Sequence, residues 1–181
     1  MSGIVGSRFN TRGSGLVGSL GTDGQVFTSS GAGVGAAFEA AAGGANTPAF
    51  AASIGVTQAL VSDTLAKVSF SNEILDTDGT YDNSSNYRFT PASAGKYMIG
   101  LRLRGNTTTD ITPKYHIYKN GSSVIDATFK NEGVAHSTQI VCAQIDDGDD
   151  YWEVYAYQNS GSNVNLNGEI GNEFWGFKII E

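Results

Sequence analysis

Three side chains could pair as a nucleophile and a base. They are Cys142, His116 and His136, the only cysteine and the only two histidines of the chain. Cys142 stands beside Ile140 and Val141, where a small thiol packs as a hydrophobe and no basic neighbour or helix N-terminus lowers its pKa. No Gly-x-Ser-x-Gly sequence surrounds a reactive serine either. We therefore expect no catalytic residues and no enzymatic activity.

A run of aspartates could hold a hard cation. Asp146, Asp147, Asp149 and Asp150 place four carboxylates within five residues. Their mutual repulsion favours either a bound calcium ion or wide access to solvent. The prediction is a solvated loop with no metal ligand and no cofactor, and calcium is the alternative.

Two other patterns match binding motifs only in spelling. Residues 13–18 have the Gly-x-Gly-x-x-Gly spacing, but the residues that follow cannot start the helix that a dinucleotide site requires. Residues 76–82 contain three aspartates, but Gly79 stands fourth where an EF-hand loop has its glycine sixth. We expect a turn in which aspartate side chains cap backbone amides.

Charge and composition exclude two classes of function. Of the 181 residues, 16% are charged, and the formal net charge is −7. Lys and Arg are scattered, so no surface is expected to neutralise phosphates, and we predict no nucleic-acid binding. No window approaches the roughly 18 consecutive apolar residues of a membrane span, and the first residues do not resemble a secretory signal. We expect a protein made in the cytoplasm, not exported by the usual route and not inserted into membranes.

The elements that position any site fall into two segments of different composition. Half of the 24 glycines precede Asn46, and neither Lys nor Arg occurs from Gly13 to Ala66. Beyond Lys67, Tyr, Phe, Val and Ile become frequent. We place an extended, glycine-rich anchoring arm at residues 1–47 and a globular head domain at residues 48–181.

The head shows the patterns of β-strands. Residues 96–104 alternate, with Tyr97, Ile99, Leu101 and Leu103 on the apolar face, as a half-buried strand does. The pair Asn120-Gly121 joins two strand-like runs in a hairpin, and residues 137–158 repeat this design around a turn at residues 146–150. Only residues 57–66 leave helix and strand open. Short strands between turns predict an all-β, antiparallel sandwich or jelly roll.

Six elements of the head follow the order of a known family. They are PAFAAS, VSFSNEILDTDGTYD, YRFTPASAGKYMIGLRLR, YKNGSSV, QIDDGDDYWEV and FWGFKII. In this order they resemble the globular head of complement component one, q subcomponent, and its relatives in the tumour-necrosis-factor-like superfamily. The resemblance implies a ten-stranded jelly roll that assembles as a homotrimer. It also implies a binding or structural module rather than an enzyme.

The strand after residues 146–150 is expected to turn tyrosines away from the core. Its predicted core-facing residues are Trp152, Val154 and Ala156. Large amphipathic rings bury much area at low entropic cost, which suits an interface between copies of the chain. The predicted trimer contacts are Tyr115, Tyr155 and Tyr157. The alternative is that these are single exposed tyrosines on a sheet.

The arm carries apolar residues with neither helical nor strand period. Ordering about 40 such residues costs on the order of 50 kcal/mol, which requires roughly 2,000 Å² of apolar contact that the arm cannot supply alone. We expect the arm to lie extended against a partner, with large side chains in pockets. The predicted anchor residues are Phe9, Leu16, Leu20, Phe27 and Phe38. Residues 36–42 are expected to form a helical turn or a neck where three chains meet.

Parts of the arm also resemble N-terminal stretches of tail-fibre and other virion proteins of bacterial viruses. These parts are GSRFN, LGTDGQVFTSSGAG and AAFEAAAG. The resemblance implies a structural protein of the virion surface, made in the host cytoplasm, that serves as a fibre, knob or decoration on capsid or tail. Its expected partners are two further copies, other virion proteins through the arm, and a glycan or protein of the host surface. The alternative is a soluble module that recognises carbohydrate or protein without any particle.

Overall fold

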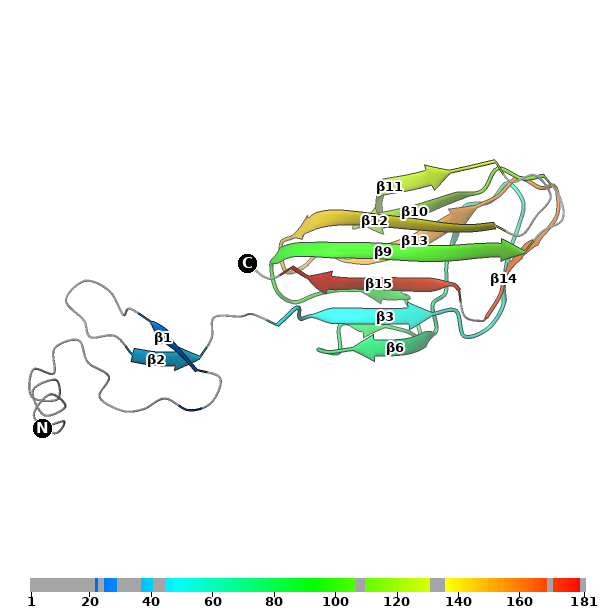
Figure 1. Cartoon of the computed structure of the whole chain (residues 1–181). Coiled ribbons are helices and arrows are strands. Elements are labelled where there is room, and N and C mark those ends of the chain that lie inside the picture. The colour runs from blue at the N-terminus through cyan, green and yellow to red at the C-terminus, as the bar shows by residue number, and fades with distance from the viewer. Residues whose placement is uncertain are drawn as a thin grey trace, which may run out of the picture. The chain divides into compact units, whose positions relative to one another are not determined.

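The computed structural model describes residues 22, 25–28, 37–40, 45–106, 110–130, 136–168 and 171–179. The chain divides into two units, Met1–Gly43 and Gly44–Glu181, which are described separately. Every regular element among the described residues is a β-strand (Figure 1). None of them forms a helix that could cross a lipid bilayer.

In the first unit, two short strands pair as an antiparallel hairpin. Strand β1 (Gln25–Thr28) lies beside β2 (Ala37–Ala40), and Phe27 stands opposite Phe38 with ring centroids 5.3 Å apart. The expectation of a helical turn within residues 36–42 is therefore wrong for Ala37–Ala40. An aromatic pair across neighbouring strands outweighs the helix propensity of the alanines.

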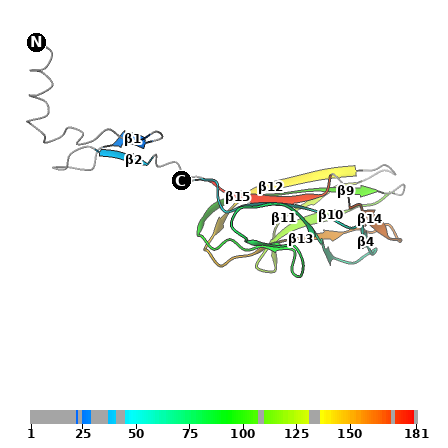
Figure 2. The same cartoon turned by 90° about the horizontal axis from the view of Figure 1, so that it is seen from below.

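The second unit is a sandwich of two antiparallel sheets, which appear as two layers in Figure 2. The larger, which we call the seven-stranded sheet, has the order β12–β9–β15–β3–β6, with β14 and β4 continuing it at the far end of β9. Its strands are β3 (Ala49–Ser53), β4 (Gln58–Leu60), β6 (Asn72–Asp76), β9 (Gly95–Asn106), β12 (His136–Asp146), β14 (Val164–Leu166) and β15 (Glu173–Lys178).

The smaller layer, which we call the six-stranded sheet, has the order β11–β10–β13–β8–β7, and β5 also pairs with β13. Its strands are β5 (Ala66–Lys67), β7 (Tyr81–Asp82), β8 (Arg88–Phe89), β10 (Lys114–Lys119), β11 (Ser122–Thr128) and β13 (Trp152–Tyr157). The all-β, antiparallel sandwich predicted from the sequence is confirmed.

Aromatic rings fill the space between the two sheets. The ring of Phe50 stacks on Phe89 at 4.3 Å and on Tyr81 at 4.9 Å, and it meets Phe174 edge-on at 4.8 Å. The predicted core faces of two strands are confirmed, because all their members are buried: Tyr97, Ile99, Leu101 and Leu103 on β9, and Trp152, Val154 and Ala156 on β13. The opposite faces of these strands therefore point out of the sandwich.

The two predicted turns have different outcomes. Asn120 and Gly121 adopt φ angles of 50° and 76° and join β10 to β11, so that hairpin is confirmed. The second hairpin, within residues 137–158, is wrong: β12 pairs with β9 in one sheet and β13 with β10 in the other. Residues 147–151 cross between the layers, because Asp146 and Trp152 are both buried in the core and the indole Nε1 of Trp152 donates to Asp146 Oδ2 at 2.8 Å.

Candidate interaction surfaces

The outward face of the seven-stranded sheet carries a band of apolar side chains. In register across the strands, Val141 lies opposite Gly100, Gly100 opposite Trp175, Trp175 opposite Ala51 and Ala51 opposite Leu75. Large side chains at the edges of this band are exposed, with Val141 at 42% and Leu75 at 48%. The band is continuous because hydrogen-bonded strands place these residues side by side on one face.

A second apolar row runs beside the first, one pleat further along the strands. It contains Ala143, Met98, Phe177 and Ala49. The rings of Phe177 and Trp175 lie nearly parallel, with centroids 6.1 Å apart and planes 13° apart. We call the two rows together, with the exposed Ile145 beside them, the apolar face.

The same sheet becomes polar beyond the apolar face. In the next row, Gln139 lies opposite Arg102, Arg102 opposite Glu173 and Glu173 opposite Ser53. The guanidinium of Arg102 is 3.8 Å from the Glu173 carboxylate, and its Nε donates to the carbonyl of Gly171 at 3.3 Å. The apolar face thus ends at a charged row toward the C-terminal end of β9.

The outward face of the six-stranded sheet has a different chemistry. Tyr155 and Tyr157 point outward from β13 and are half-buried, as the alternation of that strand predicts. Tyr118 of β10 packs against Tyr155, with centroids 4.4 Å apart. We call the rings of Tyr118, Tyr155 and Tyr157 the tyrosine platform.

Tyr115 does not belong to this platform. Its side chain is 1% exposed and packs in the core beside Ile117, while His116 and Tyr118 of the same strand point outward. The structure thus corrects the assignment of Tyr115 to a contact with another chain: the phase of β10 directs it inward. Burial also raises the pKa of its hydroxyl.

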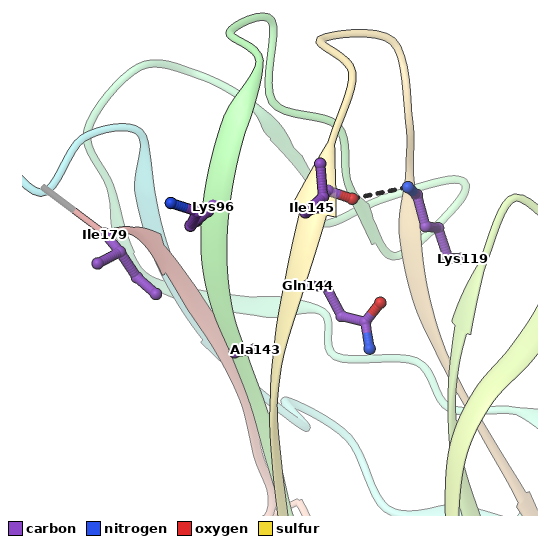
Figure 3. Close-up of a pocket in the computed structure, with 6 residues that line it drawn as sticks. All are labelled: Lys96, Lys119, Ala143, Gln144, Ile145 and Ile179. Carbon is purple, nitrogen blue, oxygen red and sulfur yellow. Dashed lines mark hydrogen bonds between the residues drawn. The ribbon is translucent and has the colours of Figure 1, made fainter. Parts of the chain in front are cut away.

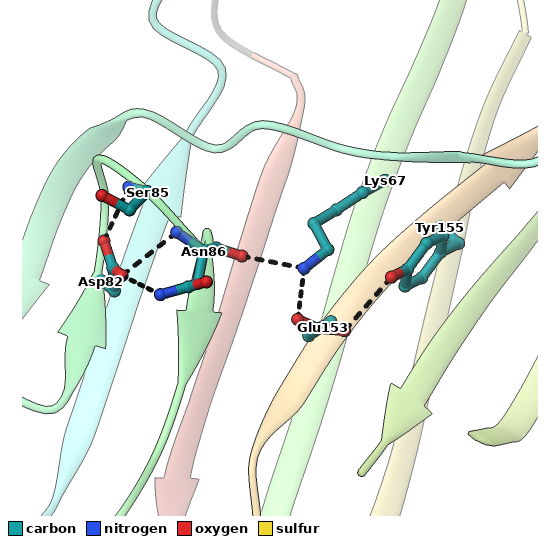
Figure 4. Close-up of polar contacts among 6 residues, drawn as sticks. All are labelled: Lys67, Asp82, Ser85, Asn86, Glu153 and Tyr155. Carbon is teal, nitrogen blue, oxygen red and sulfur yellow. Dashed lines mark hydrogen bonds and ion pairs between the residues drawn. The ribbon is translucent and has the colours of Figure 1, made fainter. Parts of the chain in front are cut away.

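A partly buried ion pair lies beside the platform (Figure 4). Glu153 of β13 is almost fully buried, pairs with the ammonium of Lys67 and accepts a hydrogen bond from the Tyr155 hydroxyl at 3.3 Å. Lys67 also donates to the carbonyl of Asn86 at 3.3 Å. Burial, and then the negative charge of Glu153, raise the pKa of Tyr155. The hydroxyl therefore stays protonated and acts as the donor.

The loop that contacts Lys67 through the Asn86 carbonyl is organised by one carboxylate. Asp82 accepts hydrogen bonds from the backbone amides of Ser85 and Asn86 and from the Asn86 side chain (Figure 4), and also from the backbone amide of Ser84. The amide of Ser85, followed by that of Ser84, holds the pKa of the Asp82 carboxyl well below its usual range. Asp82 thus caps the turn that follows residues 76–82. The turn predicted within residues 76–82 is capped by Asp76, which accepts hydrogen bonds from the amides of Asp78 at 3.3 Å and Tyr81 at 2.8 Å.

The acidic run at residues 146–150 separates into buried and exposed members. Asp146 accepts from the Gly148 amide and the Trp152 indole, and Asp150 accepts from Lys119 and Asn120. Burial raises the pKa of Asp146. Burial would also raise the pKa of Asp150, but the hydrogen bonds that it accepts, first that from Lys119, outweigh burial and lower this pKa. Asp147 and Asp149 are exposed. In the described part of the chain, no three His, Cys, Asp or Glu side chains converge as a metal-ion ligand set.

The residues considered for nucleophilic chemistry lie in different parts of the sandwich. Cys142 is on β12 and packs against the core, and burial raises the pKa of its thiol. His116 points outward from the other sheet, where its Nδ1 is 3.2 Å from the Ser123 hydroxyl. His136 begins β12 opposite Gly105. The structure does not bring Cys142 and His116 together as a nucleophile and base.

A hollow of about 510 Å³ opens at one end of the sandwich (Figure 3). Its wall is formed by Lys96, Lys119, Ala143, Gln144, Ile145 and Ile179. The Lys119 ammonium donates to the Ile145 carbonyl at 2.7 Å and pairs with Asp150 at 2.6 Å. Its charge is therefore already neutralised within the chain.

The predicted anchor residues are placed only in part. Phe9, Leu16 and Leu20 lie outside the described residues. Phe27, at 51% exposure, and Phe38 face each other across the β1–β2 hairpin. Sequence reasoning did not single out Trp175, Phe177 or Met98 as surface residues, although Met98 falls on the outward phase of the alternation at residues 96–104.

The sequence matches no family model and no curated protein. Several solved structures share the fold. Eiger TNF from S. frugiperda matches with a TM-score of 0.56 at 10% identity, over 72% of this chain and 91% of that one. The globular domain of zebrafish complement 1qA matches with a TM-score of 0.51 at 14% identity, over 74% and 98%. Murine APRIL matches with a TM-score of 0.50 at 10% identity, over 72% and 98%.

At these identities the likeness establishes the fold alone. It covers nearly the whole length of each of the three neighbours, so the match is to a complete domain rather than to a fragment. The chain carries a tumour-necrosis-factor-like jelly roll, as the order of its sequence elements predicts.

Proposed function

We propose that this protein is a structural component of a bacterial virus, a homotrimeric jelly-roll head that an N-terminal arm attaches to the particle. In this role it is a fibre, knob or decoration on capsid or tail, and its head contacts the host surface. The observation that carries the proposal is the apolar face of the seven-stranded sheet. Its half-buried Trp175, Phe177 and Met98 side chains, together with the exposed Val141, Leu75 and Ile145, are typical of a surface that associates with further copies.

Support for the arm comes from the β1–β2 hairpin. Val26 and Phe27 are exposed on a two-stranded sheet, and such a sheet is marginally stable by itself. A partner that covers these side chains would stabilise it. Support for the viral assignment comes from the resemblance of GSRFN and LGTDGQVFTSSGAG to virion proteins.

The oligomeric state is tested with two matched valine substitutions. Val141→Glu places a charge on the apolar face, whereas Val124→Glu places it on an exposed valine of the other sheet. Sedimentation of the full chain should give a trimer for the wild type and Val124→Glu, and a monomer for Val141→Glu. A monomeric wild type, or a trimeric Val141→Glu variant, would contradict association through the apolar face.

The location is tested on purified virus particles. An antibody against the head, viewed by electron microscopy, should label the capsid or the tail. Labelled protein that stays free in the lysate while the particles carry none would contradict the viral role.

The second candidate is a soluble recognition module, which the tyrosine platform favours. Limited proteolysis separates the two. The anchored head predicts cleavage confined to residues 1–45 beside a resistant trimer. A chain that is protected throughout and binds a glycan would favour the soluble module.

A further inference from the structure

The tyrosine platform is held in place by contacts that leave ring surface open. Tyr157 donates its hydroxyl to Asp63 at 2.9 Å, and the Lys114 ammonium lies 5.9 Å from the Tyr157 ring centroid. Tyr155 is fixed through Glu153, and the Lys67 ammonium lies 5.7 Å from its ring. A ligand that stacks on rings already fixed does not have to order them, which reduces the entropic cost of binding.

The surroundings of the platform are polar and contain charges of both signs. Lys114 and Asp126 are both exposed and flank His116, with Asp126 directly opposite His116 on β11. Burial lowers the pKa of His116, so the imidazole is neutral at pH 7. Lys67 and Glu153 neutralise each other. Asp63, which accepts the Tyr157 hydroxyl, adds a third carboxylate to the two ammonium groups and two carboxylates already named. The platform therefore offers donors and acceptors of both kinds, and its small excess of negative charge disfavours an anionic ligand.

The two outward faces of the sandwich differ in residue composition, as permanent and transient protein interfaces do. Permanent contacts between identical chains are strongly apolar, while recognition surfaces combine aromatic rings with polar groups. The apolar face has the first composition. The tyrosine platform has the second.

We propose that the tyrosine platform binds a neutral oligosaccharide, with the C–H face of an equatorially substituted pyranose stacked on Tyr118 and Tyr155 and its hydroxyls bonded to Lys114 and Asp126. The C–H groups of such a sugar carry a partial positive charge and meet the negative face of the tyrosine ring. Hydroxyls both donate and accept hydrogen bonds, which matches the ammonium and carboxylate groups around the platform. The proposal specifies the host-surface contact of the proposed function, but the binding it describes needs no virus particle.

Binding is measured on the full chain by saturation-transfer NMR and calorimetry, with chitotetraose and cellotetraose as neutral probes and a heparin tetrasaccharide as the anionic one. We expect a neutral probe to bind and the anionic probe to bind at least tenfold more weakly. Tyr155→Ala and Tyr118→Ala should each weaken binding about tenfold, which is the loss of one stacked ring. Tyr155→Phe keeps the ring but loses the hydrogen bond to Glu153, so it should weaken binding less than Tyr155→Ala does.

Tyr151→Ala is the matched control for loss of a tyrosine ring, because that ring contacts Arg88 rather than the platform. Circular dichroism and sedimentation establish that each variant is folded and keeps the wild-type oligomeric state. Failure of both neutral probes to bind, or binding that Tyr118→Ala and Tyr155→Ala leave unchanged, overturns the proposal. Dissociation of the oligomer in these two variants also overturns it, because the platform would then be an interface between copies. None of these outcomes bears on the apolar face, which Val141→Glu tests separately.

Discussion

At Gly100 the chain has no Cβ, and the indole of Trp175 occupies the space that one would fill. A Cβ built there would lie 2.2 Å from Trp175 Cζ2. The Trp175 indole therefore extends over Gly100 of β9, within the row that runs from Val141 to Ala51. The continuity of the apolar face depends on this single glycine.

Replacing Gly100 by Ala should displace the indole and lower the free energy of unfolding by about 1–2 kcal/mol. Urea unfolding followed by tryptophan fluorescence measures the loss. In a Trp175→Ala background the same change should cost nothing or stabilise the strand, because Ala is better than Gly in a strand interior. An equal cost in both backgrounds would contradict the packing of Trp175 on Gly100.

Asp82 gives a second prediction, which depends on pH. Its pKa is lowered in the folded chain, so its contribution to stability is present at neutral pH and is lost as the pH falls through and below the ordinary range of a carboxyl, about pH 4. Asp82→Ala should be less stable than the wild type by about 1–2 kcal/mol at pH 7, and this difference should shrink at about pH 3.

Urea unfolding at both pH values measures the Asp82 effect. Asp147→Ala is the control, because Asp147 is an exposed aspartate of the acidic run. It should change stability by less than about 0.5 kcal/mol. A difference between wild type and Asp82→Ala that stays constant with pH would exclude the carboxylate as the cause.

At the scale of elements, alternation predicts which way a side chain points but not which sheet a strand joins. The outward direction of Tyr155 follows from period two alone. The same pattern in residues 137–158 suggests a hairpin, yet β12 and β13 join different sheets, because the Asp146–Trp152 hydrogen bond in the core makes the turn a crossing. The platform could be predicted only in part, because Tyr118 joins it through the pairing of β10 with β13.

The remaining differences between prediction and structure lie in segments whose sequence is compatible with both helix and strand. Ala37–Ala40 has helix-forming alanines, but Phe38 finds Phe27 across the hairpin. Residues 57–66, which left helix and strand open, contribute β4 and the first residue of β5. In both segments a contact distant in sequence decides the structure, and a local pattern does not contain it.

A further prediction concerns the stability of the β1–β2 hairpin in the chain without a partner. Hydrogen exchange of the purified chain should be fast at Gln25–Thr28 and Ala37–Ala40 and slow at β9 and β15, because two strands alone bury too little apolar surface. Binding to the particle should slow exchange at both hairpin strands. Slow exchange there in the free chain would contradict the need for a partner.

At the scale of the whole molecule, the chemistry of the interface sets its response to salt. Association through the apolar face should be unchanged or strengthened between about 0.1 M and about 1 M NaCl, since screening weakens charge pairs and leaves apolar burial intact. Sedimentation at both concentrations measures this. A trimer that dissociates at the higher concentration would instead place the contact on charged residues such as Arg102 and Glu173.

The outward face of the seven-stranded sheet changes from apolar at Ala49 and Phe177 to charged at Arg102 and Glu173. If copies associate through this face, the end with Ala49 excludes water and forms a dry base, and the end with Arg102 stays hydrated. The chain enters β3 at Ala49, which belongs to the dry base. Three copies joined there would bring the starts of their β3 strands close together, and these are the points from which the three N-terminal arms begin. If each arm binds the same scaffold weakly, the second and third arms would then bind at millimolar effective concentration. The trimer would therefore bind the scaffold far more tightly than a single arm does.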